Sequence, residues 1–83
     1  VDTIRSLRET AQNLSHQELE RAQNALESGK SPEEVLVSFS YSLTNKFLHE
    51  PTVALRRAAE QGDLTLMKAT NRLFDLNDSE ESD

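Results

Sequence analysis

The sequence contains no cysteine, and it has only two glycines and two prolines among 83 residues. Without cysteine the chain can form no disulfide, no zinc–thiolate site and no thiol nucleophile. It has no run of about eighteen apolar residues, as a membrane-spanning helix needs, and no signal-peptide core at its N-terminus. No glycine-rich loop is present to hold a phosphate group. We therefore expect a cytoplasmic protein that contacts no membrane and has no metal or cofactor in this segment.

Positive charge is scarce, because nine Lys and Arg stand against fifteen Asp and Glu, and the net charge is −6. Four of the carboxylates, Asp78, Glu80, Glu81 and Asp83, lie at the end of the chain, and the rest of the sequence carries −2. Residues 77–83 contain no apolar side chain, so we expect an acidic disordered tail there. An acidic chain also lacks the basic footprint of nonspecific nucleic-acid binding.

The larger apolar residues are concentrated between Val35 and Leu55, where ten of the 22 that exceed alanine in size are found. One set has the three-and-four spacing of a helical stripe: Leu36, Phe39, Leu43 and Phe47. A second set repeats this spacing on the neighbouring face: Val37, Tyr41, Thr44 and Leu48. Two stripes need two neighbours, and in a chain this short the second neighbour is expected to come from another molecule.

The same segment also alternates with Ser38, Ser40 and Ser42, as a β-strand with a serine face would. The start signal favours a helix, because Ser31 suits the N-cap, Pro32 the first turn and Glu34 the capping box. We therefore predict an all-α helical bundle of about four helices, one long and three shorter, completed by homodimerisation.

The predicted helices cover residues 1–28, residues 32–49, Pro51 to residue 60 or 61, and a last one capped by Asp63 that ends near Phe74. Gly29 and Gly62 suit the left-handed position after a helix, and Pro51 should end the second helix because it lacks an N–H group. The first helix has an apolar seam that resumes one residue out of frame: Ile4, Leu7, Ala11 and Leu14, then Leu19, Ala22 and Leu26. We predict one continuous helix; the alternative is a second helix capped near Ser15.

Few side chains suit catalysis. His16 and His49 have no acid or thiol at a metal-ligand spacing, and His49 fits a cap at a helix C-terminus. The carboxylates, including Glu18 and Glu20, are expected on the polar faces of the helices.

One basic cluster brackets Pro51, where Lys46 and Arg56 could together meet an anion, with Arg57 beside them. Pairing with Glu50 or Glu60 and capping of the helix end are the alternative roles.

The segment from Thr44 to Asp63 resembles the C-terminal dimerisation domain of bacterial glutamyl-tRNA reductases. The motif residues that carry this resemblance are Asn45, Lys46, His49, Pro51, Thr52 and Arg56. The ending Leu73-Phe74-Asp75-Leu76 and the opening Ile4-Arg5 also fit, so the resemblance covers residues 1–76. The acidic tail departs from the compact ending of the family.

The resemblance implies a parent enzyme that reduces glutamyl-tRNA(Glu) to glutamate-1-semialdehyde with NADPH, in tetrapyrrole (porphyrin and haem) biosynthesis. In that family one domain carries the cysteine nucleophile and a second binds NADPH. The present chain, which starts without methionine inside a helical pattern, would be a fragment of such an enzyme. Residues 1–28 would end the long spinal helix, residues 29–76 would form the dimerisation domain, and residues 77–83 would be the tail.

On this interpretation the segment is structural and has no catalytic residue of its own. We expect the homodimer interface to involve seven apolar side chains: Phe39, Leu43, Phe47, Leu48, Val53, Leu55 and Leu66. One alternative is a tRNA-contacting module that uses Lys46, Arg56 and Arg57. Another is a surface that docks a regulatory protein.

Overall fold

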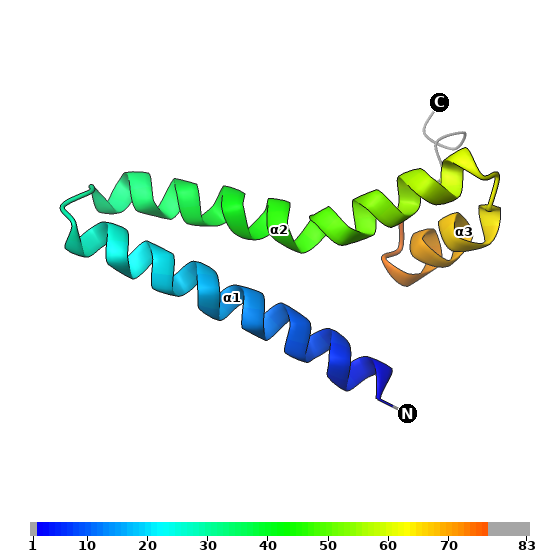
Figure 1. Cartoon of the computed structure of the whole chain (residues 1–83), viewed down its shortest axis with the longest axis horizontal. Helices are drawn as coiled ribbons and strands as arrows, with labels where there is room; N and C mark the ends of the chain where they lie inside the picture. Colours follow the sequence, from blue (N-terminus) through cyan, green and yellow to red (C-terminus); the bar gives the residue numbers. More distant parts are fainter. Residues whose placement is uncertain (1, 77–83) are drawn as a thin grey trace. The chain divides into compact units, whose positions relative to one another are not determined.

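The computed structural model describes residues 2–76, and in this range it is helical without any strand. Its helices are α1 (Thr3–Glu27), α2 (Pro32–Glu60) and α3 (Leu64–Leu73), as Figure 1 shows. The all-α prediction is confirmed, and the strand interpretation of residues 35–43 is wrong. The predicted acidic tail lies outside the described residues. None of the described helices combines the length and apolar character that crossing a membrane requires.

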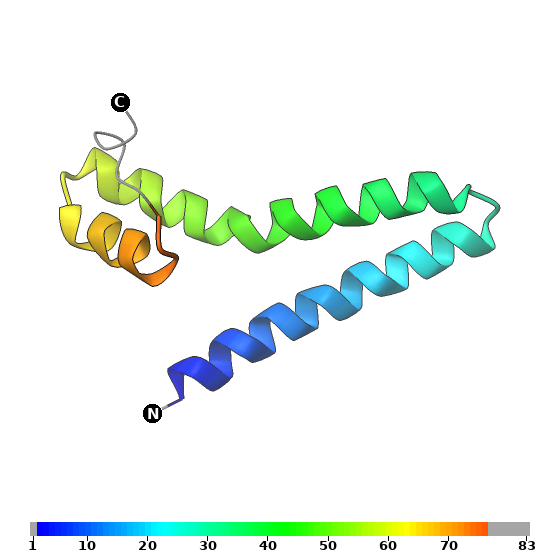
Figure 2. The ribbon, with the colours of Figure 1, turned by 180° about the vertical axis from the view of Figure 1, so that it is seen from behind.

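The chain divides into two compact units, and the division falls within α2. In the first unit, which ends at His49, α1 and the first part of α2 form an antiparallel hairpin. The same pairing is visible from behind in Figure 2. The second unit starts at Glu50 and holds the last part of α2 together with α3.

The predicted helix starts are present. The Ser31 hydroxyl accepts a hydrogen bond from the Glu34 N–H at 3.2 Å, which caps α2. The Asp63 carboxylate accepts one from the Thr65 N–H at 3.1 Å, which caps α3. Side chains close to the turns therefore satisfy backbone donors that the first helical turn leaves without partners.

Each helix is followed by a residue with a left-handed backbone. After α1, Gly29 has a φ of 103°, and the next N–H, that of Lys30, donates to the Ala25 carbonyl at 3.1 Å. This bond is the long closing bond of the Schellman motif. Gly62 has the same left-handed conformation after α2, with a φ of 72°, and Asp75 has it after α3, with a φ of 56°. The predictions for both glycines are confirmed, whereas Asp75 was not predicted in this role.

Pro51 lies inside α2, so the predicted break there is wrong and the described residues form three helices instead of four. Proline removes one N–H donor, but its fixed φ is a helical value. Pro51 is exposed, so water can reach the carbonyl of Phe47 that loses its usual partner. No glycine or turn residue lies between the predicted helices 32–49 and 51–60, and the two form one continuous helix. Consequently His49 does not stand at a helix end and the expected cap is absent.

The seam of α1 runs along its five residues that are at least partly buried: Ala11, Leu14, Glu18, Ala22 and Ala25. The prediction of one continuous helix is confirmed, but the predicted shift of the seam is wrong. Leu19 and Leu26 are exposed, because Glu18 and Ala25 occupy the inward positions beside them. The spacing of three and four therefore continues through a charged residue.

The described part of the chain has very little interior. Only two of its apolar residues are buried, Val35 in the first unit and Ala58 in the second. By contrast, 14 large hydrophobic side chains are exposed. A single copy thus leaves most of its large apolar side chains in water, which is unusual for a stable monomer.

Candidate dimerisation surface and buried ion pair

The solvent-facing side of α2 in the first unit carries large apolar side chains among small uncharged polar ones such as Ser40 and Thr44. Between Val35 and Leu48 the only charged residue is Lys46, and it pairs with α1. The large apolar side chains exposed in this stretch, here called the α2 apolar set, are Leu36, Val37, Tyr41, Phe47 and Leu48. Tyr41 is 69% exposed and Leu36 is 66% exposed. A helix with an apolar outer side normally packs against a further element.

The exposed leucines of α1 lie on the same side of the hairpin as part of this set. Leu19 and Leu26 each follow an inward residue of α1. On α2, Leu36 follows the buried Val35, and Phe47 follows Lys46, whose ammonium reaches Glu18 of α1. A step of one residue turns a helix by about 100°. Viewed down one axis, successive residues of two antiparallel helices turn in opposite senses, and the inward directions of the two helices are opposite too. The step of one residue therefore carries all four side chains to the same face of the hairpin. We call them the hairpin face.

The predicted interface residues differ in exposure. Phe47, Leu48 and Leu66 are exposed, whereas the other four are partly covered: Phe39, Leu43, Val53 and Leu55. Sequence reasoning omitted Leu36 and Tyr41 from the interface, although both belong to the predicted stripes. It also omitted Leu19 and Leu26, which it had placed on the seam. The assignment of these residues to an interface stays a prediction.

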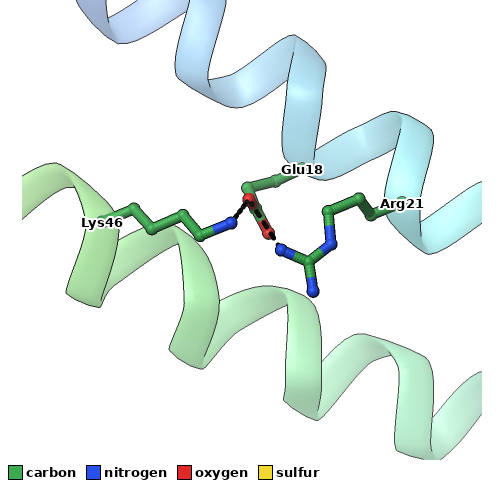
Figure 3. A network of polar contacts seen from close by, with 3 residues as sticks. All are labelled: Glu18, Arg21 and Lys46. Atoms are coloured by element: carbon green, nitrogen blue, oxygen red, sulfur yellow. Dashed lines mark hydrogen bonds and ion pairs between the residues drawn. The ribbon is translucent and has the colours of Figure 1, made fainter.

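A partly buried ion pair crosses the seam between α1 and α2, as Figure 3 shows. Lys46 Nζ donates a hydrogen bond to Glu18 Oε2 at 2.7 Å. The Glu18 side chain is 2% exposed and that of Lys46 is 43% exposed. Arg21, one turn further along α1, brings Nη1 to 3.7 Å from the same carboxylate oxygen.

The pKa of Glu18 is held below its ordinary value of 4.5, chiefly by the hydrogen bond from Lys46 and next by one from Ser42. Burial acts in the opposite direction and raises the pKa. Because only two helices cover the carboxylate, the hydrogen bonds outweigh the loss of water. Glu18 is therefore ionised at neutral pH and anchored to α2.

The prediction that Glu18 lies on a polar face is wrong. Its position was detectable, because Glu18 stands four residues after Leu14 and four before Ala22. A carboxylate in the middle of an apolar seam instead suggested a change of frame. Lys46 pairs with this carboxylate, and not with Glu50 or Glu60.

The predicted basic cluster is divided between the two units. Lys46 belongs to the first unit, whereas Arg56 and Arg57 belong to the second and are exposed. The remaining motif residues are exposed too: Asn45, His49, Pro51 and Thr52. His16 makes a local contact only, between Nδ1 and the Gln12 carbonyl at 3.1 Å.

A hollow of about 250 Å³ opens beside Glu18 between α1 and α2. Its wall combines charged, hydroxyl and apolar groups, among them Arg21, Lys30, Glu34 and Phe39. The one carboxylate in it that is buried, Glu18, already faces two cations. Among residues 2–76 no three His, Asp or Glu side chains are grouped as a metal site would need.

Residues 1–76 match the family model described as the glutamyl-tRNAGlu reductase dimerisation domain. The chain belongs to this family. The glutamyl-tRNA reductase of Saccharophagus degradans is 44% identical over 82 residues, which cover 99% of this chain and 19% of that relative. The relative from Teredinibacter turnerae is 42% identical over 77 residues, covering 93% of this chain and 19% of its own length.

A third glutamyl-tRNA reductase, from Coxiella burnetii, is 43% identical over 75 residues, or 90% of this chain and 18% of its own length. This dimerisation domain thus spans about a fifth of the length of the curated relatives it matches. No solved structure matches it at a significant level. The resemblance inferred from the motif residues is confirmed, and the apolar outer side of α2 lies in a domain whose family is defined by dimerisation.

Proposed function

We propose that this domain holds two copies of a glutamyl-tRNA reductase together and takes no direct part in the chemistry. The parent protein would be a cytoplasmic oxidoreductase that reduces glutamyl-tRNA(Glu) to glutamate-1-semialdehyde with NADPH, in porphyrin biosynthesis. The names of the relatives support this activity. Because the domain spans about a fifth of their length, the NADPH site and the catalytic nucleophile would belong to the rest of the protein.

The exposed apolar surface of the first unit is the observation that carries the proposal. The α2 apolar set and the leucines of the hairpin face stand in solvent in a single copy. Pairing of two identical chains about a twofold axis would cover the same surface on both and leave no open end. Interfaces between identical subunits are also the ones richest in apolar side chains.

Phe47 provides the direct test. It is 37% exposed in the single chain, so an aspartate at this position can reach water in a monomer but would be buried without a partner in a dimer. Burying an unpaired charge costs several kcal/mol, so Phe47→Asp is expected to raise the dimer Kd at least about 100-fold. Sedimentation at several concentrations measures this constant.

The matched control is Glu20→Ala, a change at an exposed position of α1, which should leave the Kd within about threefold of the original value. A wild-type chain that stays monomeric at high micromolar concentration would contradict the proposal. Equal dimer affinity of the two variants would place the interface elsewhere.

Contact with tRNA is a second candidate, supported by the exposure of Arg56 and Arg57. Neither arginine takes part in an ion pair within residues 2–76. Phosphate contacts make binding depend steeply on salt. If Arg56 and Arg57 contact tRNA, replacing both by alanine in the parent enzyme is expected to weaken tRNA binding and to make the binding constant depend less steeply on salt, while the dimer stays intact. An unchanged slope excludes this role.

A further inference from the structure

We propose that the Glu18–Lys46 pair fixes the rotation of α1 about its own axis, so that Leu19 and Leu26 stay outside the hairpin and available to a partner chain. This inference rests on the proposed dimerisation, since it names what makes the dimerising surface available. Glu18 and Lys46 are positioning residues in this role.

A competing rotation of α1 is built into its sequence. Leu19, Ala22 and Leu26 form a seam of their own, with larger side chains than those of the observed seam. Around Glu18 the observed seam offers Ala11, Ala22 and Ala25, with Leu14 as its largest apolar member. Apolar contact is non-directional and grows with the area that is buried. On that ground alone α1 would turn its leucines toward α2.

The polar contacts of Glu18 oppose this rotation of α1, because they can form only in the observed orientation of the helix. Glu18 is 2% exposed and receives its hydrogen bond from Lys46 at 2.7 Å, with a further bond from Ser42. Turning α1 so that Leu19 faces α2 would carry the carboxylate away from both donors. A hydrogen bond between charged groups is shorter and stronger than a neutral one. Buried polar groups are known to select one helix arrangement over another in this way.

The consequence concerns the hairpin face. In the observed rotation Leu19 and Leu26 lie on the same side as Leu36 and Phe47. In the competing rotation the two leucines would be covered by their own chain, and half of the hairpin face would be lost to the partner. The ion pair would thus strengthen dimerisation indirectly, by keeping Leu19 and Leu26 exposed to the partner chain.

A distance measurement within one chain tests the rotation. Because the chain has no cysteine, cysteines placed at Gln17 and Asn45 would carry the only two spin labels. Both positions are exposed and lie away from the hairpin face. Excess unlabelled chain keeps each measured distance within one molecule. Turning the leucines inward points residue 17 away from α2, which should lengthen the label distance by on the order of 5 Å.

Glu18→Ala removes the anchor without adding apolar bulk, and Glu20→Ala is the matched control on the exposed side. We expect the longer distance in Glu18→Ala, with a dimer Kd raised at least tenfold, and wild-type values in Glu20→Ala. Glu18→Gln keeps the volume and one acceptor oxygen but not the charge, so both distances should be populated.

A wild-type distance and Kd in Glu18→Ala would overturn the proposal. If Glu18→Ala loses its helical signal, Glu18→Gln decides, and a single wild-type distance in that variant also overturns it. A wild-type chain that never dimerises would contradict the proposed function alone, because the distance between the two labels reports on the hairpin of one chain.

Discussion

At the scale of single residues, the two members of the ion pair differ in their access to water. Lys46 is 43% exposed and can remain hydrated without Glu18, whereas Glu18 is 2% exposed and depends on its partners. The net contribution of the pair to the free energy of unfolding is therefore reduced, because the cost of removing Glu18 from water offsets part of its attraction to Lys46. Removing one partner of a buried pair is costly when the other stays buried and charged.

Lys46→Met is therefore expected to lower the melting temperature more than Glu18→Met at pH 7. The first change leaves a buried carboxylate whose remaining polar partners are Ser42 and, at 3.7 Å, Arg21, while the second leaves an ammonium that can turn to solvent. Thermal unfolding followed by circular dichroism at one chain concentration compares them. Equal losses in the two variants would show that Glu18 is hydrated in solution.

The pH dependence of stability gives a second test of the same carboxylate. Its pKa is lowered in the folded state, mainly by the hydrogen bond from Lys46. A lowered pKa means that the folded state favours the ionised form, so this contribution is complete above the ordinary value of 4.5. It is lost as the pH falls through the lower folded-state value.

Melting temperatures of the wild type and Glu18→Gln, measured from pH 7 to pH 3, isolate this effect from that of the other carboxylates. The advantage of the wild type should be constant above about pH 5 and shrink below pH 4.5. An advantage that persists unchanged at pH 3 would mean that the ion pair does not set this pKa.

At the scale of helices, local signals in the sequence were sufficient for most ends. Ser31 and Asp63 cap helices as predicted, and Gly29 and Gly62 close them. These features depend on a few neighbouring residues, and so the sequence alone predicts them well. The prediction for Pro51 was wrong because the effect of a proline depends on the residues around it. With helix-forming residues on both sides, the loss of one donor does not end α2.

Gly29→Ala tests the closing turn of the hairpin. A β-carbon at this position meets no atom within 4 Å, so the cost comes from the φ of 103° alone. That cost is expected to be about 1 kcal/mol of unfolding free energy. Gly29→Asn should lose less, because asparagine tolerates left-handed geometry better than alanine. Urea unfolding at fixed chain concentration measures both, and equal stability of all three chains would contradict this account.

At the scale of the whole molecule, two apolar stripes on one helix predicted that the chain needs an external partner. The described chain buries only two apolar residues, which agrees with this prediction because a single copy cannot cover both stripes. The sequence did not predict the rotation of α1. Two seams compete there, and the choice between them depends on Lys46, which lies 28 residues after Glu18. Periodicity detects which faces are apolar, but it cannot weigh one distant polar contact against a larger apolar seam.

If folding and association are linked, the melting midpoint must depend on concentration. Mass action favours the dimer as the chain becomes more concentrated, so the midpoint should rise with each tenfold step. Differential scanning fluorimetry with an external dye, over two or three such steps, measures this shift. A midpoint indifferent to dilution, together with a monomer in sedimentation, would count against dimerisation.

The small interior also determines how the stability of the chain varies with temperature. The heat-capacity change of unfolding follows the apolar area exposed, at about 12–15 cal/mol/K per residue for ordinary domains. With Val35 and Ala58 as the buried apolar residues of the described chain, a separated protomer has little such area to expose. Its heat-capacity change should fall well below the ordinary range, whereas that of the dimer should approach it. The curvature of stability with temperature would then be a property of the interface, and a protomer without its partner would have a nearly flat stability curve.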